Sequence, residues 1–128
     1  MRQNVAVCDQ RRAAVFEITP KTLVVRPAES GLCACTNHFR TQGLATLIDC
    51  TRYATLVKTQ GAGKLSVADV ARQMDLVNQG AWTLQTMIFE TAALKLHLAF
   101  GKGPATRLPL HTLDLKSLFA AGQDPKSR

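Results

Sequence analysis

Residues 66–100 read SVADVARQMDLVNQGAWTLQTMIFETAALKLHLAF, and this stretch decides the fold class because it predicts a helix followed by strands. Ser66, with Asp69 three residues later, has the pattern of a capping box in which Asp stands in place of Glu. An apolar stripe at helical spacing then leads to Gly80, which closes the predicted helix. The stripe consists of Val67, Val70, Ala71, Met74 and Val77.

After this helix, residues 83–89 and 94–100 predict two strands joined by a turn at residues 90–93. The second strand alternates strictly, so large apolar side chains share one of its faces. These are Leu94, Leu96, Leu98 and Phe100. We expect a hairpin with a buried side and a wetter side. Trp82, at the entry to the first strand, is expected to be a packing residue. The core is expected to include Met74, Met87, Phe89 and Phe100.

The N-terminal quarter of the chain alternates short β-rich runs with turn residues. Residues 5–8, 13–19 and 22–26 predict an antiparallel meander of three strands. Residues 31–36 form a fourth run of the same kind. If the chain stays extended there, positions 33, 35 and 37 point to one side.

A further helix is predicted after residue 43, with Asp49 as its N-cap. Its apolar positions recur at helical spacing, and Gly61 and Gly63 mark its end. Those positions are Tyr53, Leu56 and Val57.

The predicted order is strands, two main helices, then strands. Such segregated elements indicate an α+β fold with antiparallel strands, because a doubly wound sheet would alternate strands with helices. We predict a single domain over residues 1–128, with Asp114 capping a final short turn and a frayed tail at residues 122–128.

The composition narrows the classes of function. The apolar content of 46% and the charged content of 20% are ordinary for a folded globular protein. A net charge of +7 is suited to nucleic acid or to an anionic substrate such as a coenzyme A thioester. The basic residues are scattered and aromatic residues are few, which argues against nucleic acid. No apolar stretch approaches the roughly 20 residues of a membrane span, so no membrane partner is expected.

The four cysteines do not have the pattern of a disulfide framework, because the chain is longer than small secreted domains and shows no secretory leader. We expect reduced thiols and a cytoplasmic location.

Functional side chains are densest at residues 33–38. One interpretation is a metal site built from Cys33, Cys35 and His38, with Cys50 or His97 as a further ligand. Structural zinc sites, however, separate paired cysteines by at least two residues. The plainer interpretation is that both thiols of the pair are packed as small apolar groups.

Two other interpretations involve acyl chemistry. A thiolate of Cys35 beside the imidazole of His38 would form a nucleophile pair. Alternatively, the side-chain amide of Asn37 would donate to the oxyanion of a tetrahedral intermediate. A loop asparagine is otherwise an ordinary turn residue.

Several stretches together resemble one family. CTNHFR at residues 35–40 and DCTRYATL at residues 49–56 are similar to the acyl-coenzyme A:6-aminopenicillanic acid acyltransferases. That family is related to the choloylglycine hydrolases and penicillin V acylases. The similarity continues through residues 83–90, 94–101 and 113–119, so it covers most of the chain. The Thr-Asn-His-Phe element is its most specific part.

The resemblance implies an αββα sandwich in which an N-terminal cysteine attacks an amide or thioester carbonyl of a small acyl substrate, through an acyl-cysteine intermediate. It implies that Asn37 stabilises the oxyanion and that Arg52 is an active-site cation. His38 is carried over only as a neighbour of Asn37. No cofactor and no metal are required.

The sequence departs from the family at its start. Met1 is followed by Arg2, so no nucleophile is expected there, and Cys8 lies inside a predicted strand. We therefore expect the nucleophile on a preceding segment, which would be a partner of this chain. The open sheet edges would also permit homo-oligomers. The alternatives are a non-catalytic interaction module with the same fold and a small basic nucleic-acid-binding domain.

Overall fold

The computed structural model describes residues 2–45 and 49–121. The chain divides into two compact units, Met1–Leu65 and Ser66–Arg128. Each has mixed α and β structure with one antiparallel three-stranded sheet. The single domain stays a prediction, and the predicted tail at residues 122–128 lies outside the described residues. Within the described ranges, no helix is both long enough and apolar enough to cross a membrane.

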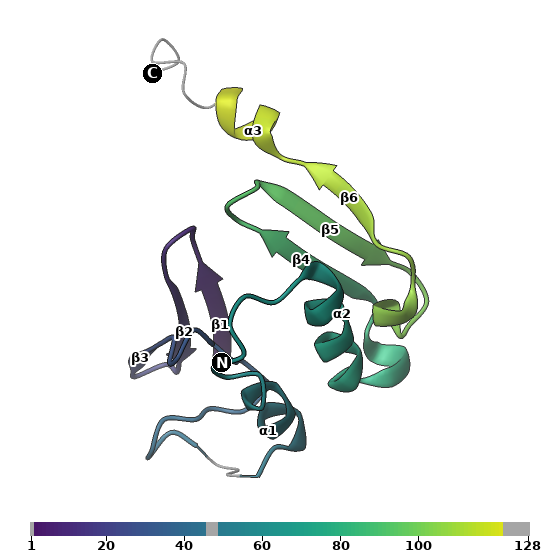
Figure 1. Ribbon diagram of the computed structural model, residues 1–128. Coiled ribbons are helices and arrows are strands. Elements are labelled where there is room, and N and C mark those ends of the chain that lie inside the picture. Colours follow the sequence, from purple (N-terminus) through teal and green to yellow (C-terminus); the bar gives the residue numbers. More distant parts are fainter. Residues whose placement is uncertain (1, 46–48, 122–128) are drawn as a thin grey trace. The chain divides into compact units, whose positions relative to one another are not determined.

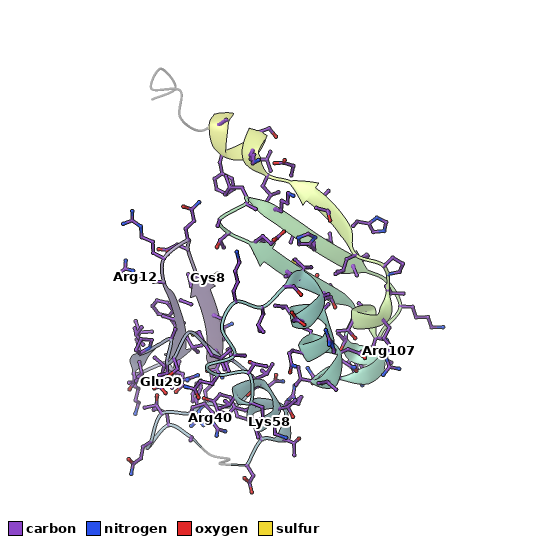
Figure 2. All side chains as sticks on the ribbon, viewed as in Figure 1. Cys8, Arg12, Glu29, Arg40, Lys58 and Arg107 are labelled. Carbon is purple, nitrogen blue, oxygen red and sulfur yellow. The ribbon has the colours of Figure 1, made fainter. Side chains whose placement is uncertain are left out.

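The sheet of the first unit confirms the predicted meander. It consists of β1 (Gln3–Cys8), β2 (Ala13–Ile18) and β3 (Leu23–Pro27), in that order across the sheet (Figure 1). Cys8 and Arg12 lie at the turn between β1 and β2 (Figure 2). The carboxylate of Asp9 closes this turn by accepting from the backbone N–H of Arg11 and of Arg12, at 2.6 and 2.7 Å.

The two faces of this sheet differ in exposure. Val15 and Glu17, from the middle of β2, are both completely buried on one face. On the other face, Phe16 lies opposite Val5 and Val25. That face is apolar and largely exposed, since it includes Val5, Val7, Leu23 and Val25.

Residues 31–36 do not form the predicted fourth strand, and only an isolated bridge joins Glu29 and Leu32. Side chains satisfy this backbone instead of a neighbouring strand. The carbonyl of Ala34 accepts from Arg26 Nη2 at 3.3 Å, and that of Thr36 accepts from Asn4 Nδ2 at 2.7 Å.

The helix predicted after residue 43 is α1 (Thr51–Val57). Its N-cap is Cys50, so the prediction of Asp49 was wrong by one position. Cys50 makes no side-chain capping bond, but its carbonyl accepts the first helical bond from the N–H of Ala54 at 3.0 Å.

The second unit begins with the predicted capping box and α2 (Val67–Leu76). Ser66 Oγ accepts from the N–H of Asp69 at 3.2 Å, and the N–H of Ser66 donates to Asp69 Oδ2 at 3.0 Å. The predicted apolar stripe is half-buried, whereas Leu76 off the stripe is exposed. A short 3₁₀ turn, η1 (Gly80–Trp82), follows α2.

Replacing Ser66 by alanine should remove one of these two bonds. We expect Ser66→Ala to lower the free energy of unfolding by about 1 kcal/mol, because an orphan helix N–H loses its acceptor. Urea unfolding would measure the change. Ser66→Thr keeps the acceptor oxygen and is the matched control, so an equal loss in both variants would contradict the capping role.

The predicted hairpin is confirmed as β4 (Gln85–Glu90) and β5 (Lys95–Phe100). A third strand, β6 (His111–Asp114), pairs with β5 and was not predicted. A short 3₁₀ turn, η2 (Ala105–Arg107), precedes β6, and α3 (Lys116–Ala121) follows it (Figure 1). Asp114, predicted to cap the last turn, is the last residue of β6, and the carbonyl of Leu115 accepts the first bond of α3 from the N–H of Phe119 at 3.3 Å. The Oδ1 of Asp114 accepts from the N–H of Lys116 at 2.9 Å, so the prediction was wrong by one position.

The buried face of this sheet is not the leucine face of β5. Thr86, Ile88, His97 and Ala99 are buried, and α2 and η2 pack against these strands. His97 is accommodated because Nε2 lies 2.7 Å from Glu90 Oε2 and Nδ1 lies 2.9 Å from Thr112 Oγ1. The opposite face is apolar and partly exposed. The predictions of core or packing positions were therefore wrong for Trp82, Met87, Phe89 and Phe100, which are 42–87% exposed.

Candidate functional site

Asn37 and the other candidates at residues 33–38 lie on a stretch that we call the 33–41 loop (residues 33–41). A buried carboxylate holds it against the first sheet. Glu17 Oε1 accepts from Arg26 Nε and from the N–H of Arg40, both at 2.7 Å. Glu17 Oε2 accepts from the N–H of Thr41 at 3.0 Å. Together with the bonds to the carbonyls of Ala34 and Thr36, these contacts hold the loop on both sides of Asn37.

The charge of Glu17 makes the stability of this arrangement dependent on pH. Burial raises the pKa of Glu17, but hydrogen bonds from Arg40, Thr41 and Arg26 outweigh it and lower the pKa below its ordinary value of 4.5. The stabilisation is therefore present above about pH 4.5 and is lost as the pH falls through the lowered pKa of the folded chain.

We expect the free energy of unfolding to fall with pH below about 4.5, and to fall less steeply in Glu17→Gln, which has no carboxyl to protonate. Urea unfolding of both proteins across the acid range would measure this. Parallel pH profiles would contradict the assignment to Glu17.

Asn37 lies at a bend in the middle of the 33–41 loop, with an exposed side chain. No other described residue forms a hydrogen bond with the side-chain amide of Asn37. The amide is therefore free to donate to an incoming oxygen, and the anchored backbone on both sides limits its movement.

Arg52 lies in the first turn of α1, with a half-buried side chain. Among the described residues it has no ion pair or hydrogen bond through its guanidinium. No bond joins Arg52 to Asn37 within the described chain. Both roles therefore stay predictions.

The structure places the thiol of Cys50 beside the 33–41 loop, which sequence analysis did not predict. The thiol of Cys50, just before α1, lies 3.8 Å from Thr36 Oγ1. Burial raises the pKa of Cys50, but hydrogen bonds from the Tyr53 backbone, His38 and Thr36, together with the charge of His38, outweigh it and lower the pKa to about 7. Sequence analysis named Cys50 only as a metal ligand. No spacing rule connects it to residue 38, because the contact depends on where the 33–41 loop meets α1.

The alternatives built on the other thiols are not supported. Burial raises the pKa of Cys33 and of Cys35, which makes them poorer nucleophiles at neutral pH. The thiol of Cys35 donates to the carbonyl of Thr36 at 3.9 Å, and among the described residues no hydrogen bond joins it to His38. Within residues 2–45 and 49–121, no three His, Cys, Asp or Glu side chains are placed to hold a metal ion, so the alternative metal site is not formed.

A pocket lies between β3, the start of the 33–41 loop and α1. It is lined in part by Arg26, Cys33, Tyr53 and Gln60. The guanidinium of Arg40 stacks over the Tyr53 ring, 4.0 Å from its centre, which orients the ring. Neither Asn37 nor the thiol of Cys50 lines this pocket.

Comparisons with known proteins add no family assignment. No protein-family model matches the chain, and neither does any curated protein or solved structure.

Proposed function

We propose that this chain is the C-terminal portion of an N-terminal-nucleophile acyltransferase or amidohydrolase. It would act on amide or acyl-thioester bonds through an acyl-cysteine intermediate, with the nucleophile supplied by a separate segment. One structural observation carries the proposal beyond the resemblance. Each of the two antiparallel sheets has one covered face and one apolar face on which several large side chains are exposed. Sheets of this kind are suited to an αββα sandwich, whose inner faces pack on another sheet.

In this proposal the roles follow the resemblance and the local geometry. Asn37 donates its amide to the oxyanion from an anchored loop, and it has no competing partner among the described residues. Arg52 contributes positive charge from α1, two residues after Cys50. The protein needs no cofactor or metal for this chemistry, because an N-terminal cysteine supplies both nucleophile and base.

The proposed partners are the nucleophile-bearing segment and a small acyl substrate. The edge strands β1, β3, β4 and β6 offer the surface for strand addition or for homo-oligomers. The scattered positive charge supports an anionic substrate over nucleic acid. The four cysteines, all free of disulfides, support a reducing cytoplasmic compartment.

The test is to co-express this chain with the segment encoded directly upstream and to purify what associates with it. We expect a complex that cleaves amide or acyl-thioester substrates, with an acyl adduct on the partner's first residue in the mass spectrum. Failure of any upstream segment to associate, together with a stable and inactive chain, would overturn the proposal and favour the interaction module.

A further inference from the structure

The three strands of the second sheet bring a hydroxyl, an imidazole and a carboxylate into one line. His97 on the central strand β5 lies opposite Thr112 on β6, and its Nδ1 is 2.9 Å from Thr112 Oγ1. The other ring nitrogen, Nε2, is 2.7 Å from Oε2 of Glu90 on β4. Side chains from three strands therefore form one hydrogen-bonded chain, and the proposed function gives it no task.

The two contacts of His97 fix the tautomer of the neutral ring. An ionised carboxylate only accepts hydrogen bonds, so Nε2 carries the proton that is donated to Glu90. Nδ1 is then an acceptor, and the hydroxyl of Thr112 donates to it. The imidazole is thus already bonded to the proton that a general base would remove. This is the pattern of nucleophile, base and orienting carboxylate that activated hydroxyls share, with the two ring nitrogens exchanged relative to the Ser-His-Asp triad.

The line runs from the interior of the unit to its surface. The side chain of His97 is 11% exposed, and that of Glu90 is 42% exposed. Thr112, on the edge strand β6, is exposed. Burial limits the movement of the ring, whereas a small molecule can reach the hydroxyl from solvent.

A lysine adds positive charge on the same face of the sheet. Lys95 on β5 is paired with Glu90 on one side and with Asp114 on the other. Alternation places it on the face that carries His97, two residues away. Among the described residues, no ion pair or hydrogen bond uses its ammonium group. A cation close to Thr112 favours the oxyanion that forms when a hydroxyl attacks a carbonyl.

We propose that Thr112 is a nucleophilic hydroxyl, activated by His97 and oriented through it by Glu90, that hydrolyses small carboxylic esters. His97 Nδ1 takes the hydroxyl proton while Thr112 Oγ1 attacks the ester carbonyl carbon. The bond from that carbon to the alcohol oxygen breaks, and the alcohol leaves with the proton from Nδ1. Water then attacks the acyl-threonine, and its proton returns through His97 to Oγ1. Ester and water become acid and alcohol, so no oxidant or reductant is required.

An ester is the substrate class that this site favours. An alcohol leaves more readily than an amine, so an ester requires less stabilisation of the oxyanion than an amide does. The site offers one cation for that purpose, and the exposed hydroxyl on an edge strand is open to small molecules. The nucleophile belongs to this chain, so the chemistry is separate from that of the upstream segment.

Labelling of the chain alone with an alkyl fluorophosphonate tests the hydroxyl directly. Thr112 Oγ1 would displace fluoride from phosphorus, and peptide mass spectrometry would locate the adduct. We expect the adduct on Thr112, none in Thr112→Val, and labelling restored in Thr112→Ser. Thr22 is exposed and has no histidine partner among the described residues, so it is the internal reference.

Glu90→Gln tests the positioning role. The side-chain amide can donate to Nε2, so the ring is no longer held in the tautomer that accepts from Thr112. We expect the labelling rate to fall by roughly a hundredfold, the contribution of a well-placed general base. The ¹⁵N chemical shifts of the His97 ring should show the loss of the pure Nε2–H tautomer. A purely structural role of Glu90 would lower stability and leave the tautomer and the rate of the folded chain unchanged.

Hydrolysis of p-nitrophenyl acetate then tests turnover. We expect it to be lost in Thr112→Val and unchanged in His111→Gln, which removes the neighbouring exposed histidine. The proposal is overturned if Thr112→Val hydrolyses the ester like the original chain, if Thr22 labels as fast as Thr112, or if Glu90→Gln labels at the original rate. Should Glu90→Gln not fold, the exposed substitutions at Thr112 decide. Because no upstream segment is present, a negative result leaves the proposed function standing.

Discussion

Glu17→Ala is expected to lower the free energy of unfolding by about 3–5 kcal/mol, because it leaves a largely buried cation without its partner. Arg26 is 22% exposed and loses its carboxylate. The N–H groups of Arg40 and Thr41 lose their acceptor in the same substitution. A loss of this size is a large part of the total stability of about 5–15 kcal/mol of an ordinary domain.

Urea unfolding measures the loss, and hydrogen exchange of peptides that cover the 33–41 loop shows where it acts. Glu17→Gln keeps one acceptor oxygen and the shape, so its loss should be smaller. Glu29→Ala removes an exposed acidic side chain from the same unit, and it should change stability by less than about 0.5 kcal/mol. If Glu17→Ala resembled Glu29→Ala, the anchoring role would be refuted.

Asn37→Ala has the second large expected effect, on activity instead of stability. In the active complex proposed above, we expect kcat to fall by about 10²–10³, the usual result of removing one oxyanion donor. KM should change little, because the donor acts on the charge that develops in the transition state. The exposed side chain predicts no loss of folding.

Steady-state kinetics of the complex provide the measurement. Gln42→Ala removes another exposed amide five positions along the chain and is the matched control. Equal kinetics for the two variants would exclude Asn37 from the oxyanion site while leaving open which reaction the complex performs.

Local signals predicted the elements whose causes are local. The capping box fixed the start of α2, and turn residues separated the three strands of the first sheet. β6 was missed because it is a four-residue edge strand that begins shortly after Pro109, and such a strand has too few residues to show a period. The run at residues 31–36 looked like a strand, but the side chains of Arg26 and Asn4 satisfy its backbone.

Alternation predicted which residues of β5 share a face, but not which of its faces is covered. Neighbouring residues of a strand point to opposite faces, and the buried face is the one that carries His97. Hydrogen bonds from the His97 ring to the side chains of Glu90 and Thr112, on the two neighbouring strands, make this burial acceptable. These partners cannot be identified before the register is known. The contact between Cys50 and Thr36 was hidden for a similar reason, because it depends on tertiary structure and not on spacing.

The anchoring of the 33–41 loop by Glu17 also sets an order of events in folding. The bonds from Arg40 and Thr41 to Glu17 join residues 23 and 24 positions apart, and Asn4 reaches Thr36 across 32 positions. Contacts between distant residues form late, because the entropy of loop closure must be overcome first. The acceptor of the loop lies on β2, a central strand whose hairpins are local in sequence. During synthesis the meander is therefore able to form before the residues that bind to it have emerged, and we expect the loop that bears Asn37 to become ordered after the meander.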